Sequence, residues 1–205
     1  MNKLKAFIDA VRLEAGCDEA GRGCLSGPVV AAAVILNPRK RIKGLDDSKK
    51  LTEKQRFLLR DEIMEKALAF AIGIVSPQEI DKINILNASI KAMHLAVEQL
   101  SVEPAFLLID GNRFKPYKQI PHECFIKGDG RFQSIAAASI LAKTTRDLIM
   151  DELDEQFPNY RWKKNKGYPT IEHREAVRQF GPTVHHRMSF RLLPEEAEQL
   201  KLFDE

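Results

Sequence analysis

The stretch VVAAAVIL, from Val29 to Leu36, restricts the fold of this chain more than any other segment. It is apolar throughout, rich in branched residues and preceded by a Ser-Gly-Pro turn, which is the pattern of a buried strand. Leu13 to Asp18 is short enough to be the strand before it. We therefore expect a hairpin that holds Gly21, Arg22 and Gly23 at its bend.

Strand-like and helical segments alternate along the rest of the chain. Thr52 to Gln55 form a capping box, which marks the start of a helix. We expect helices at about 53–68, 87–100, from 132 onward and 171–180, a short one starting at 76–79, and strands at 70–75, 105–110 and 124–126. This order predicts an α/β core over residues 1–155 and a C-terminal helical extension with an acidic tail over 156–205.

At 205 residues, of which 44% are hydrophobic and 30% charged, the chain suits one domain with a full core. No apolar run approaches the roughly 20 residues of a membrane helix, and the N-terminus lacks a secretory pattern. Cys17, Cys24 and Cys124 have no CxxC spacing, so we expect reduced, packed thiols. We expect a cytoplasmic monomer that does not enter a membrane.

The net charge of +3 is small, but the charges are unevenly spread. Segment 39–50 carries six basic residues and two acids, segment 161–187 seven and two, and segment 194–205 one lysine and five acids. Basic patches of this kind suit a polyanionic partner and equally suit an ordinary solvated surface. Charge alone leaves both interpretations open.

Four acids fall at expected strand ends or glycine-flanked turns: Asp18, Glu19, Asp110 and Asp129. Two carboxylates about 4 Å apart repel by roughly 4 kcal/mol at an effective dielectric near 20, so a cluster needs compensation. Carboxylates without His or Cys favour Mg²⁺ or Mn²⁺ over zinc, and two such ions suit phosphodiester hydrolysis. Each Asp-Gly pair alone is more often a turn, but the four together favour a metal site.

Gly21, Arg22 and Gly23 directly follow two of these acids. Flanking glycines let backbone amides approach a ligand that a Cβ would block. Arg22 can form two hydrogen bonds to a phosphate beside the metals. The acids therefore suit bound cations, and Arg22 beside them suits a phosphate that bridges to those cations.

Six sequence blocks occur in a fixed order: DEAGRG at 18–23, LDDSKKL at 45–51, IDG at 109–111, KGD at 127–129, AAASILAKTTRD at 136–147, and NKGYPT with His173 at 165–173. Together they resemble type 2 ribonuclease H in its bacterial form, over roughly residues 12–190. The resemblance implies a ribonuclease H-like mixed five-stranded sheet flanked by helices. It also implies an endonuclease that cuts the RNA strand of RNA/DNA hybrids, and cuts 5′ of single ribonucleotides in duplex DNA, leaving a 3′-hydroxyl and a 5′-phosphate.

The resemblance also implies roles for individual residues. Asp18, Glu19, Asp110 and Asp129 match the family's acids that bind two divalent ions, Mn²⁺ or Mg²⁺. Gly21, Arg22 and Gly23 match the loop that senses the 2′-hydroxyl at the junction of RNA and DNA, and Tyr168 matches the tyrosine that works with it. Lys49 and Lys50 are both candidates for contact with a backbone phosphate.

Two aromatic or basic sites have no assigned role at this stage. Trp162 lies among lysines, where it could stack on a nucleic acid or cover the edge of the core. His185, His186 and Arg187 could touch phosphate, but we expect a solvated loop there.

The tail contains Gln199, Leu200, Leu202 and Phe203 after an acidic stretch. This pattern resembles the motif by which bacterial replication and repair proteins dock on the sliding clamp, and such peptides anchor in apolar pockets. The alternative is that these apolar side chains fold back onto the protein's own core.

Other functions fit the sequence less well. A nucleic-acid-binding module without activity gains nothing from four clustered negative charges facing a phosphate backbone. A phosphatase or a DNA-directed nuclease of related fold has no reason for the 2′-hydroxyl loop and Tyr168. The sequence therefore favours the metal-dependent ribonuclease.

Overall fold

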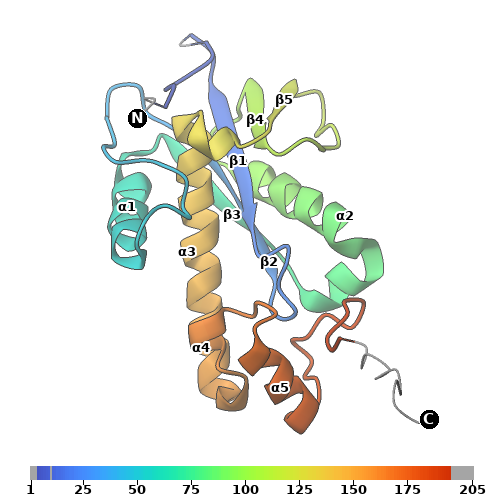
Figure 1. Ribbon diagram of the computed structural model, residues 1–205. Coiled ribbons are helices and arrows are strands. Elements are labelled where there is room, and N and C mark those ends of the chain that lie inside the picture. The colour runs from blue at the N-terminus through green and yellow to red at the C-terminus, as the bar shows by residue number, and fades with distance from the viewer. Residues whose placement is uncertain (1–3, 10, 195–205) are drawn as a thin grey trace, which may run out of the picture.

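The computed structural model describes residues 4–9 and 11–194, and within them five strands form one sheet (Figure 1). The strands are β1 (Glu14–Ala20), β2 (Val29–Ile35), β3 (Ala69–Val75), β4 (Phe106–Asp110) and β5 (His122–Phe125), in the order β3-β2-β1-β4-β5. β2 is antiparallel to β1 and β3, whereas β1, β4 and β5 are parallel. The expected mixed five-stranded sheet is confirmed.

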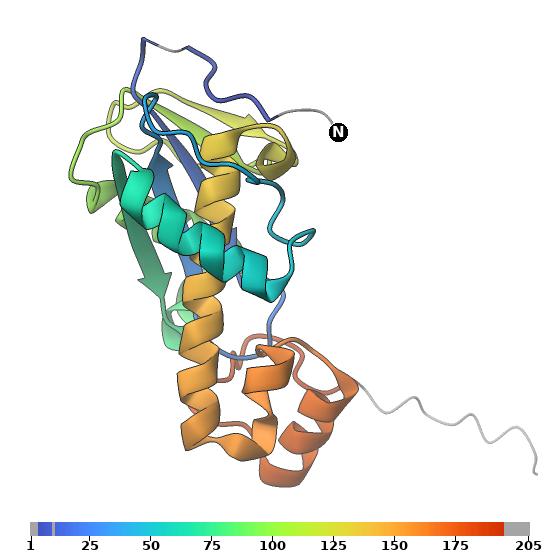
Figure 2. The same cartoon turned by 90° about the vertical axis from the view of Figure 1, so that its left-hand side faces the viewer.

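Helices cover both faces of this sheet (Figures 1 and 2). The helical elements are α1 (Glu53–Lys66), α2 (Pro77–Glu98), η1 (Gly128–Gly130), α3 (Gln133–Gln156), η2 (Pro158–Tyr160), α4 (Trp162–Asn165) and α5 (Ile171–Phe180). α2 packs on one face, and α3 packs on the other with α1 beside it. In the described ranges, no helix has both the length and the apolarity that a membrane span requires.

The surroundings of β2 explain why apolar and polar residues do not alternate along this strand. Ala31 and Ala33 enter the core under α2, whereas Ala32 and Val34 enter the core under α1 and α3. Both faces of the strand are buried, so both must be apolar. Close packing extends to β1, where a Cβ on Gly16 would lie 2.2 Å from the carbonyl carbon of Ser134 in α3.

Most expected elements are confirmed, and two differ in detail. The capping box of Thr52 and Gln55 is present at the start of α1. The two helices expected after Ser76 are contiguous in α2, where Asn84 separates them with φ 64° and ψ 164°. The hairpin of β1 and β2 forms, but its loop spans residues 21–28 rather than a three-residue bend.

The C-terminal part packs against the end of α3 through its own apolar cluster. Trp162 is completely buried, with Tyr160 stacked on it and Met150 of α3 in the same cluster. Trp162 therefore covers a core and is not available to stack on a nucleic acid. The solvated loop expected at His185–Arg187 was wrong, because His186 and Arg187 are 2% and 0% exposed.

Candidate active site

The sheet places the predicted acids at one edge. Asp18 and Glu19 lie near the end of β1, Asp110 ends β4, and Asp129 lies in η1 after β5. Cys17 pairs with Ile109 in parallel register, so Asp18 and Asp110 follow at the same level of adjacent strands. The carboxyl ends of parallel strands form the usual edge for a functional site in an α/β sheet.

Burial and mutual repulsion raise the pKa of three of these acids. The pKa of Asp18 is raised well above its usual range, first by burial and then by the charges of Glu19 and Asp110. Burial also raises the pKa of Glu19, with Arg22 acting in the opposite direction. For Asp129, burial and then the charge of Asp110 raise the pKa. The cluster therefore resists full ionisation in the absence of a cation.

Glu19 contains an unsatisfied polar atom. Its Oε1 accepts a hydrogen bond from the Arg22 guanidinium at 3.2 Å. Its Oε2 is buried and has no hydrogen-bond partner. A buried carboxylate oxygen without a partner is costly, so its position requires an explanation beyond packing.

The other acids are turned to local donors. Asp110 Oδ1 accepts from the Gly128 N–H at 2.7 Å, and Asp129 Oδ1 accepts from its neighbour's N–H at 2.9 Å. Asp18 Oδ1 accepts from the Glu19 N–H at 2.7 Å. Across residues 4–9 and 11–194, no three His, Cys, Asp or Glu side chains already stand as a set that could hold a metal ion. The carboxylates thus converge on one edge but are held by separate partners.

A cavity of about 310 Å³ opens beside the acids. Asp18, Glu19 and Asp110 line it together with residues 21–23 and Tyr168. Asp129 does not line this cavity, although Asp110 is close enough for its charge to raise the pKa of Asp129 in addition to the larger effect of burial. The structure therefore brings three of the four acids, the glycine-flanked arginine and the tyrosine to one space.

The loop at 21–28 rests on two buried arginines. Arg146 is 1% exposed and donates to the carbonyls of Ser26, Pro28 and Lys166 at 2.8–3.0 Å. Gly21 has φ +98°, and a Cβ there would lie 2.1 Å from Arg146 Nε. By contrast, a Cβ on Gly23 would meet open space. Gly21 thus lets the loop approach the buried arginine, and Gly23 leaves the outer surface open.

Arg187 completes this support from the C-terminal side. It is fully buried and donates to the carbonyls of Gly27 at 2.9 Å and Arg22 at 3.0 Å. Burial lowers the pKa of its guanidinium to about 10. The contacts of Arg146 and Arg187 with the backbone carbonyls of this loop were not foreseen from the sequence, because they join residues more than 100 positions apart.

The structure distinguishes the two candidate lysines. Lys49 lines the cavity, and its charge lowers the pKa of Asp129 against the larger effect of burial. Lys50 instead forms an ion pair with Asp46 at 3.2 Å. Lys49 is therefore the better placed of the two to meet a phosphate in this cavity.

Two further polar residues of the cavity were missed. Ser139 and Lys143 lie one turn apart on α3 and both line it. The signal was present in the sequence, since these polar residues interrupt the alanine-rich face of the helix at a spacing of four.

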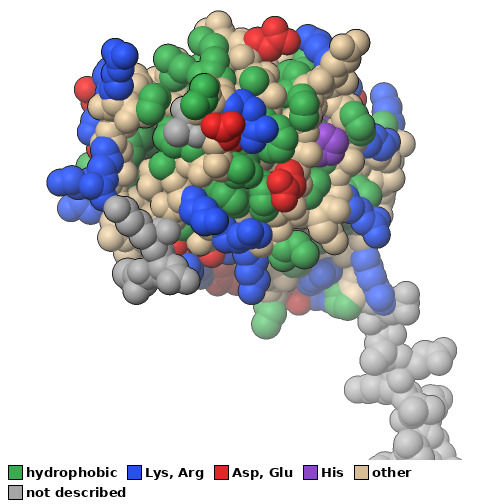
Figure 3. Space-filling view, turned by 90° about the horizontal axis from the view of Figure 1, so that it is seen from above, with side chains coloured by type: hydrophobic (Ala, Val, Ile, Leu, Met, Phe, Trp, Pro, Cys, Tyr) green, Lys and Arg blue, Asp and Glu red, His purple; other side chains and the backbone are tan. Residues whose placement is uncertain are grey.

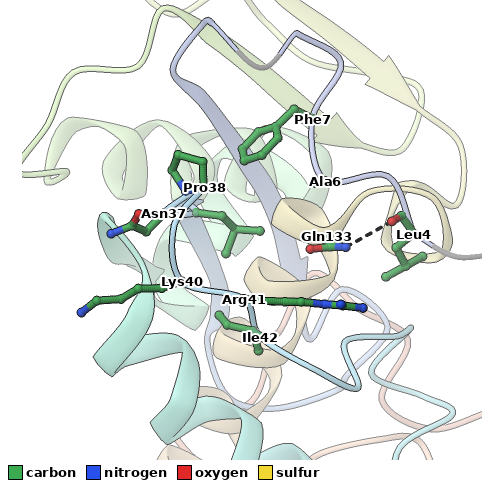
Figure 4. Close-up of a pocket in the computed structure, with 10 residues that line it drawn as sticks. Leu4, Ala6, Phe7, Asn37, Pro38, Lys40, Arg41, Ile42 and Gln133 are labelled. Carbon is green, nitrogen blue, oxygen red and sulfur yellow. Dashed lines mark hydrogen bonds between the residues drawn. The ribbon is translucent and has the colours of Figure 1, made fainter.

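The described residues also form other cavities, one of which adjoins this site. One of about 430 Å³ shares Glu19, Arg22 and Asp110 with the first and extends to Arg113. Another of about 420 Å³ lies between the N-terminal segment and the loop after β2, where Gln133 donates to the Leu4 carbonyl (Figure 4). No acid or histidine lines it.

Viewed from above, basic side chains are dispersed among hydrophobic and acidic ones rather than gathered in one patch (Figure 3).

Comparison with known proteins identifies the family. Residues 15–193 match the family model described as Ribonuclease HII. The chain belongs to the ribonuclease HII family. Its identity to Ribonuclease HII of Parabacteroides distasonis is 60% over 193 residues, covering 94% of this chain and 97% of the relative. It is accordingly a ribonuclease H endonuclease, a hydrolase of phosphodiester bonds.

Solved structures agree with the fold. The RNase HII of a PCNA:RNase HII complex from Archaeoglobus fulgidus superimposes with a TM-score of 0.74 at 25% identity, covering 91% of this chain and 98% of that one. A Bst-RNase HIII in complex with Mn²⁺ gives 0.69 at 19% identity, covering 88% and 68%. The sheet is thus of the ribonuclease H type.

Proposed function

We propose that this ribonuclease HII cuts the RNA strand of RNA/DNA hybrids and cuts 5′ of single ribonucleotides in duplex DNA, leaving a 3′-hydroxyl and a 5′-phosphate. The observation that carries the proposal is the shared cavity of Asp18, Glu19, Asp110, residues 21–23 and Tyr168. Groups suited to hydrolysis lie beside groups suited to recognising a sugar hydroxyl. Backbone groups of such a loop can distinguish ribose from deoxyribose without reading the base.

The donor set fits two divalent ions, Mn²⁺ or Mg²⁺. The four carboxylates are oxygen ligands of the type these ions prefer, and Glu19 Oε2 is a buried oxygen that lacks a partner. The RNase HIII solved with Mn²⁺ supports the choice of metal. When bound, such ions supply an activated water and stabilise the leaving oxygen. Asp18, Glu19, Asp110 and Asp129 would hold them.

The chain's own residues then divide the remaining work. Arg22 is paired with Glu19 at 3.2 Å and is 52% exposed at its side chain, so its guanidinium can turn to a phosphate once Glu19 takes another partner. Lys49 and Lys143 add positive charge along the same cavity. The ring of Tyr168, 41% exposed, offers a flat surface for the sugar.

A duplex with one embedded ribonucleotide, beside an all-DNA control of the same sequence, tests this function. We expect cutting of the first alone, only with Mg²⁺ or Mn²⁺, and a 3′-hydroxyl on the upstream product. Equal cutting of both duplexes, or undiminished cutting in a chelator, would contradict the proposal. Replacing Tyr168 with Phe or Ala should reduce cutting at a single ribonucleotide.

Docking on a sliding clamp is a separate part of the proposal. The PCNA:RNase HII complex supports it for a relative. The residues we assign to docking, Gln199, Leu200, Leu202 and Phe203, lie outside the described residues. Deleting 199–205 should leave cleavage of a short duplex intact and abolish recovery with the clamp. Retained recovery would show that another surface docks.

A further inference from the structure

Three buried side chains lie directly behind Tyr168. Trp162 and His173 are completely buried, and His186 is 2% exposed. Trp162 Nε1 contacts His173 Nε2 at 3.0 Å, and His186 Nε2 contacts the same His173 atom at 3.2 Å. His173 Nδ1 lies 2.9 Å from the Tyr168 carbonyl oxygen. The histidines thus connect the extension's core to the backbone of a cavity residue.

The partners fix the tautomer of His173. A carbonyl oxygen only accepts, so His173 Nδ1 must carry the proton that is donated to Tyr168. An indole N–H only donates, so His173 Nε2 must be unprotonated to receive Trp162. Both contacts therefore require the same neutral form of the ring.

His186 is fixed in the complementary form. Its Nδ1 accepts from the Thr183 backbone N–H at 2.9 Å, so its proton is on Nε2, which faces His173. Burial lowers the pKa of both rings, that of His186 to about 4; repulsion from His173 lowers the pKa of His186 further, and the charge of Arg174 lowers that of His173. The Trp162 and His186 N–H groups share the one lone pair of His173 Nε2, so both rings are neutral and each ring nitrogen has a partner.

The backbone of Tyr168 is held on several sides. Its N–H donates to the Asn165 carbonyl at 2.9 Å, and its carbonyl receives Thr170 N–H at 2.8 Å in addition to His173. The carbonyl of the preceding Gly167 accepts a hydrogen bond at 2.8 Å from the N–H of Leu25, which lies in the loop at 21–28. Burial, and then the charge of the neighbouring Cys24 thiol in that loop, raise the pKa of the Tyr168 hydroxyl.

We propose that His173 is a positioning residue for Tyr168, and that through it Trp162 and His186 fix the tyrosine ring against residues 21–23. The inference rests on the proposed function, because Tyr168 is given its role there. Recognition of the ribose then depends on a histidine that never touches the substrate. A ring displaced by about 1 Å costs roughly 100-fold in rate when orientation matters.

Two amide variants of His173 distinguish the positioning role from simple filling of the core. In His173→Asn the side-chain N–H stands at the level of Nδ1 and can still donate to Tyr168, whereas in His173→Gln the amide stands at the level of Nε2 and cannot. We expect His173→Asn to retain clearly more of the wild-type kcat on the single-ribonucleotide duplex than His173→Gln, because it keeps the bond to the Tyr168 carbonyl and loses only the contacts with Trp162 and His186. His173→Gln should lose roughly 10- to 100-fold in kcat, with a smaller change in KM.

A double-mutant cycle with Tyr168→Ala gives the decisive readout. If His173 acts through Tyr168, adding His173→Gln to Tyr168→Ala lowers kcat no further. All assays run well below the melting temperature of each variant, which is measured alongside. Effects that multiply, or equal losses in the Asn and Gln variants, would overturn the inference. No cleavage by the wild type would instead contradict the proposed function.

Discussion

The carboxylate edge and the histidine cluster both bury ionisable groups, and they do so in opposite ways. At the edge, burial and repulsion raise the pKa of Asp18, and one oxygen of Glu19 has no partner. In the cluster, the ring nitrogens of His173 and His186 all have partners, and both rings are neutral. At the edge we interpret the unpaired oxygen, among clustered acids beside a cavity, as the place of a ligand, and we interpret the cluster, where each ring nitrogen has a partner, as a structural support.

The largest effect is expected at the unsatisfied edge. Asp110→Asn should lower turnover of the single-ribonucleotide duplex by at least about 100-fold, because it removes the charge of a proposed metal ligand and even outer-shell partners of metals contribute 10- to 100-fold. Single-turnover kinetics and a binding assay measure the two effects separately. Asp61→Asn on α1, 77% exposed at its side chain, is the matched control and should be active. Comparable activity in the two variants would remove Asp110 from the site.

The second-largest effect is expected at Arg146, the buried arginine under the loop at 21–28, where a substitution should lower the stability of the protein. Arg146→Met leaves the carbonyls of Ser26, Pro28 and Lys166 without this donor and should lower the free energy of unfolding by about 3 kcal/mol. Denaturant unfolding measures it. Arg113→Met, at an exposed position, should change this energy by less than about 0.5 kcal/mol. If both variants unfold alike, the buried arginine does not hold the loop.

Acid should weaken the histidine cluster. The pKa of His186 is lowered from 6.5 to about 4, so its contribution to stability is present above pH 6.5 and is lost as the pH falls toward 4. We expect a loss of about 2 kcal/mol from this group after allowance for solvent screening. Thermal melts across this pH range compare the wild type with His186→Gln, which cannot titrate. Parallel curves would indicate that His186 does not contribute.

The smallest expected effect is a substitution that raises, rather than lowers, the free energy of unfolding. In a chelator at neutral pH, Asp110→Asn should raise the free energy of unfolding by about 1 kcal/mol, because it removes a like charge beside Asp18 and Glu19. Its Oδ1 can still accept from Gly128. Asp61→Asn should show no such gain. A destabilised Asp110→Asn would mean that the acids do not repel one another in the folded state.

Elements governed by local patterns were predicted well from the sequence. The capping box of Thr52, the apolar run at β2 and the strand that ends in Asp110 each carry their signal within a few residues. The convergence of Asp18 and Asp110 could also be anticipated, since adjacent parallel strands end at one edge.

Features that depend on distant contacts were not predictable in this way. His186 and Arg187 look like a polar loop in the sequence, but their partners lie in other segments and bury them. The loop at 21–28 was expected as a short bend, since nothing local shows that Arg146 donates to the Ser26 and Pro28 carbonyls in it. Lys143 was missed because its helix was interpreted only by its alanines.

The two arginines under residues 21–28 also impose an order on biosynthesis. The acids of β1 and the loop after it leave the ribosome first, but Arg187 follows more than 150 residues later. Chains emerge and begin folding from the N-terminus. A nascent chain that has not yet reached Arg187 therefore carries all four acids without one of the donors that hold the Arg22 and Gly27 carbonyls, and the loop takes its final shape only when translation is almost complete.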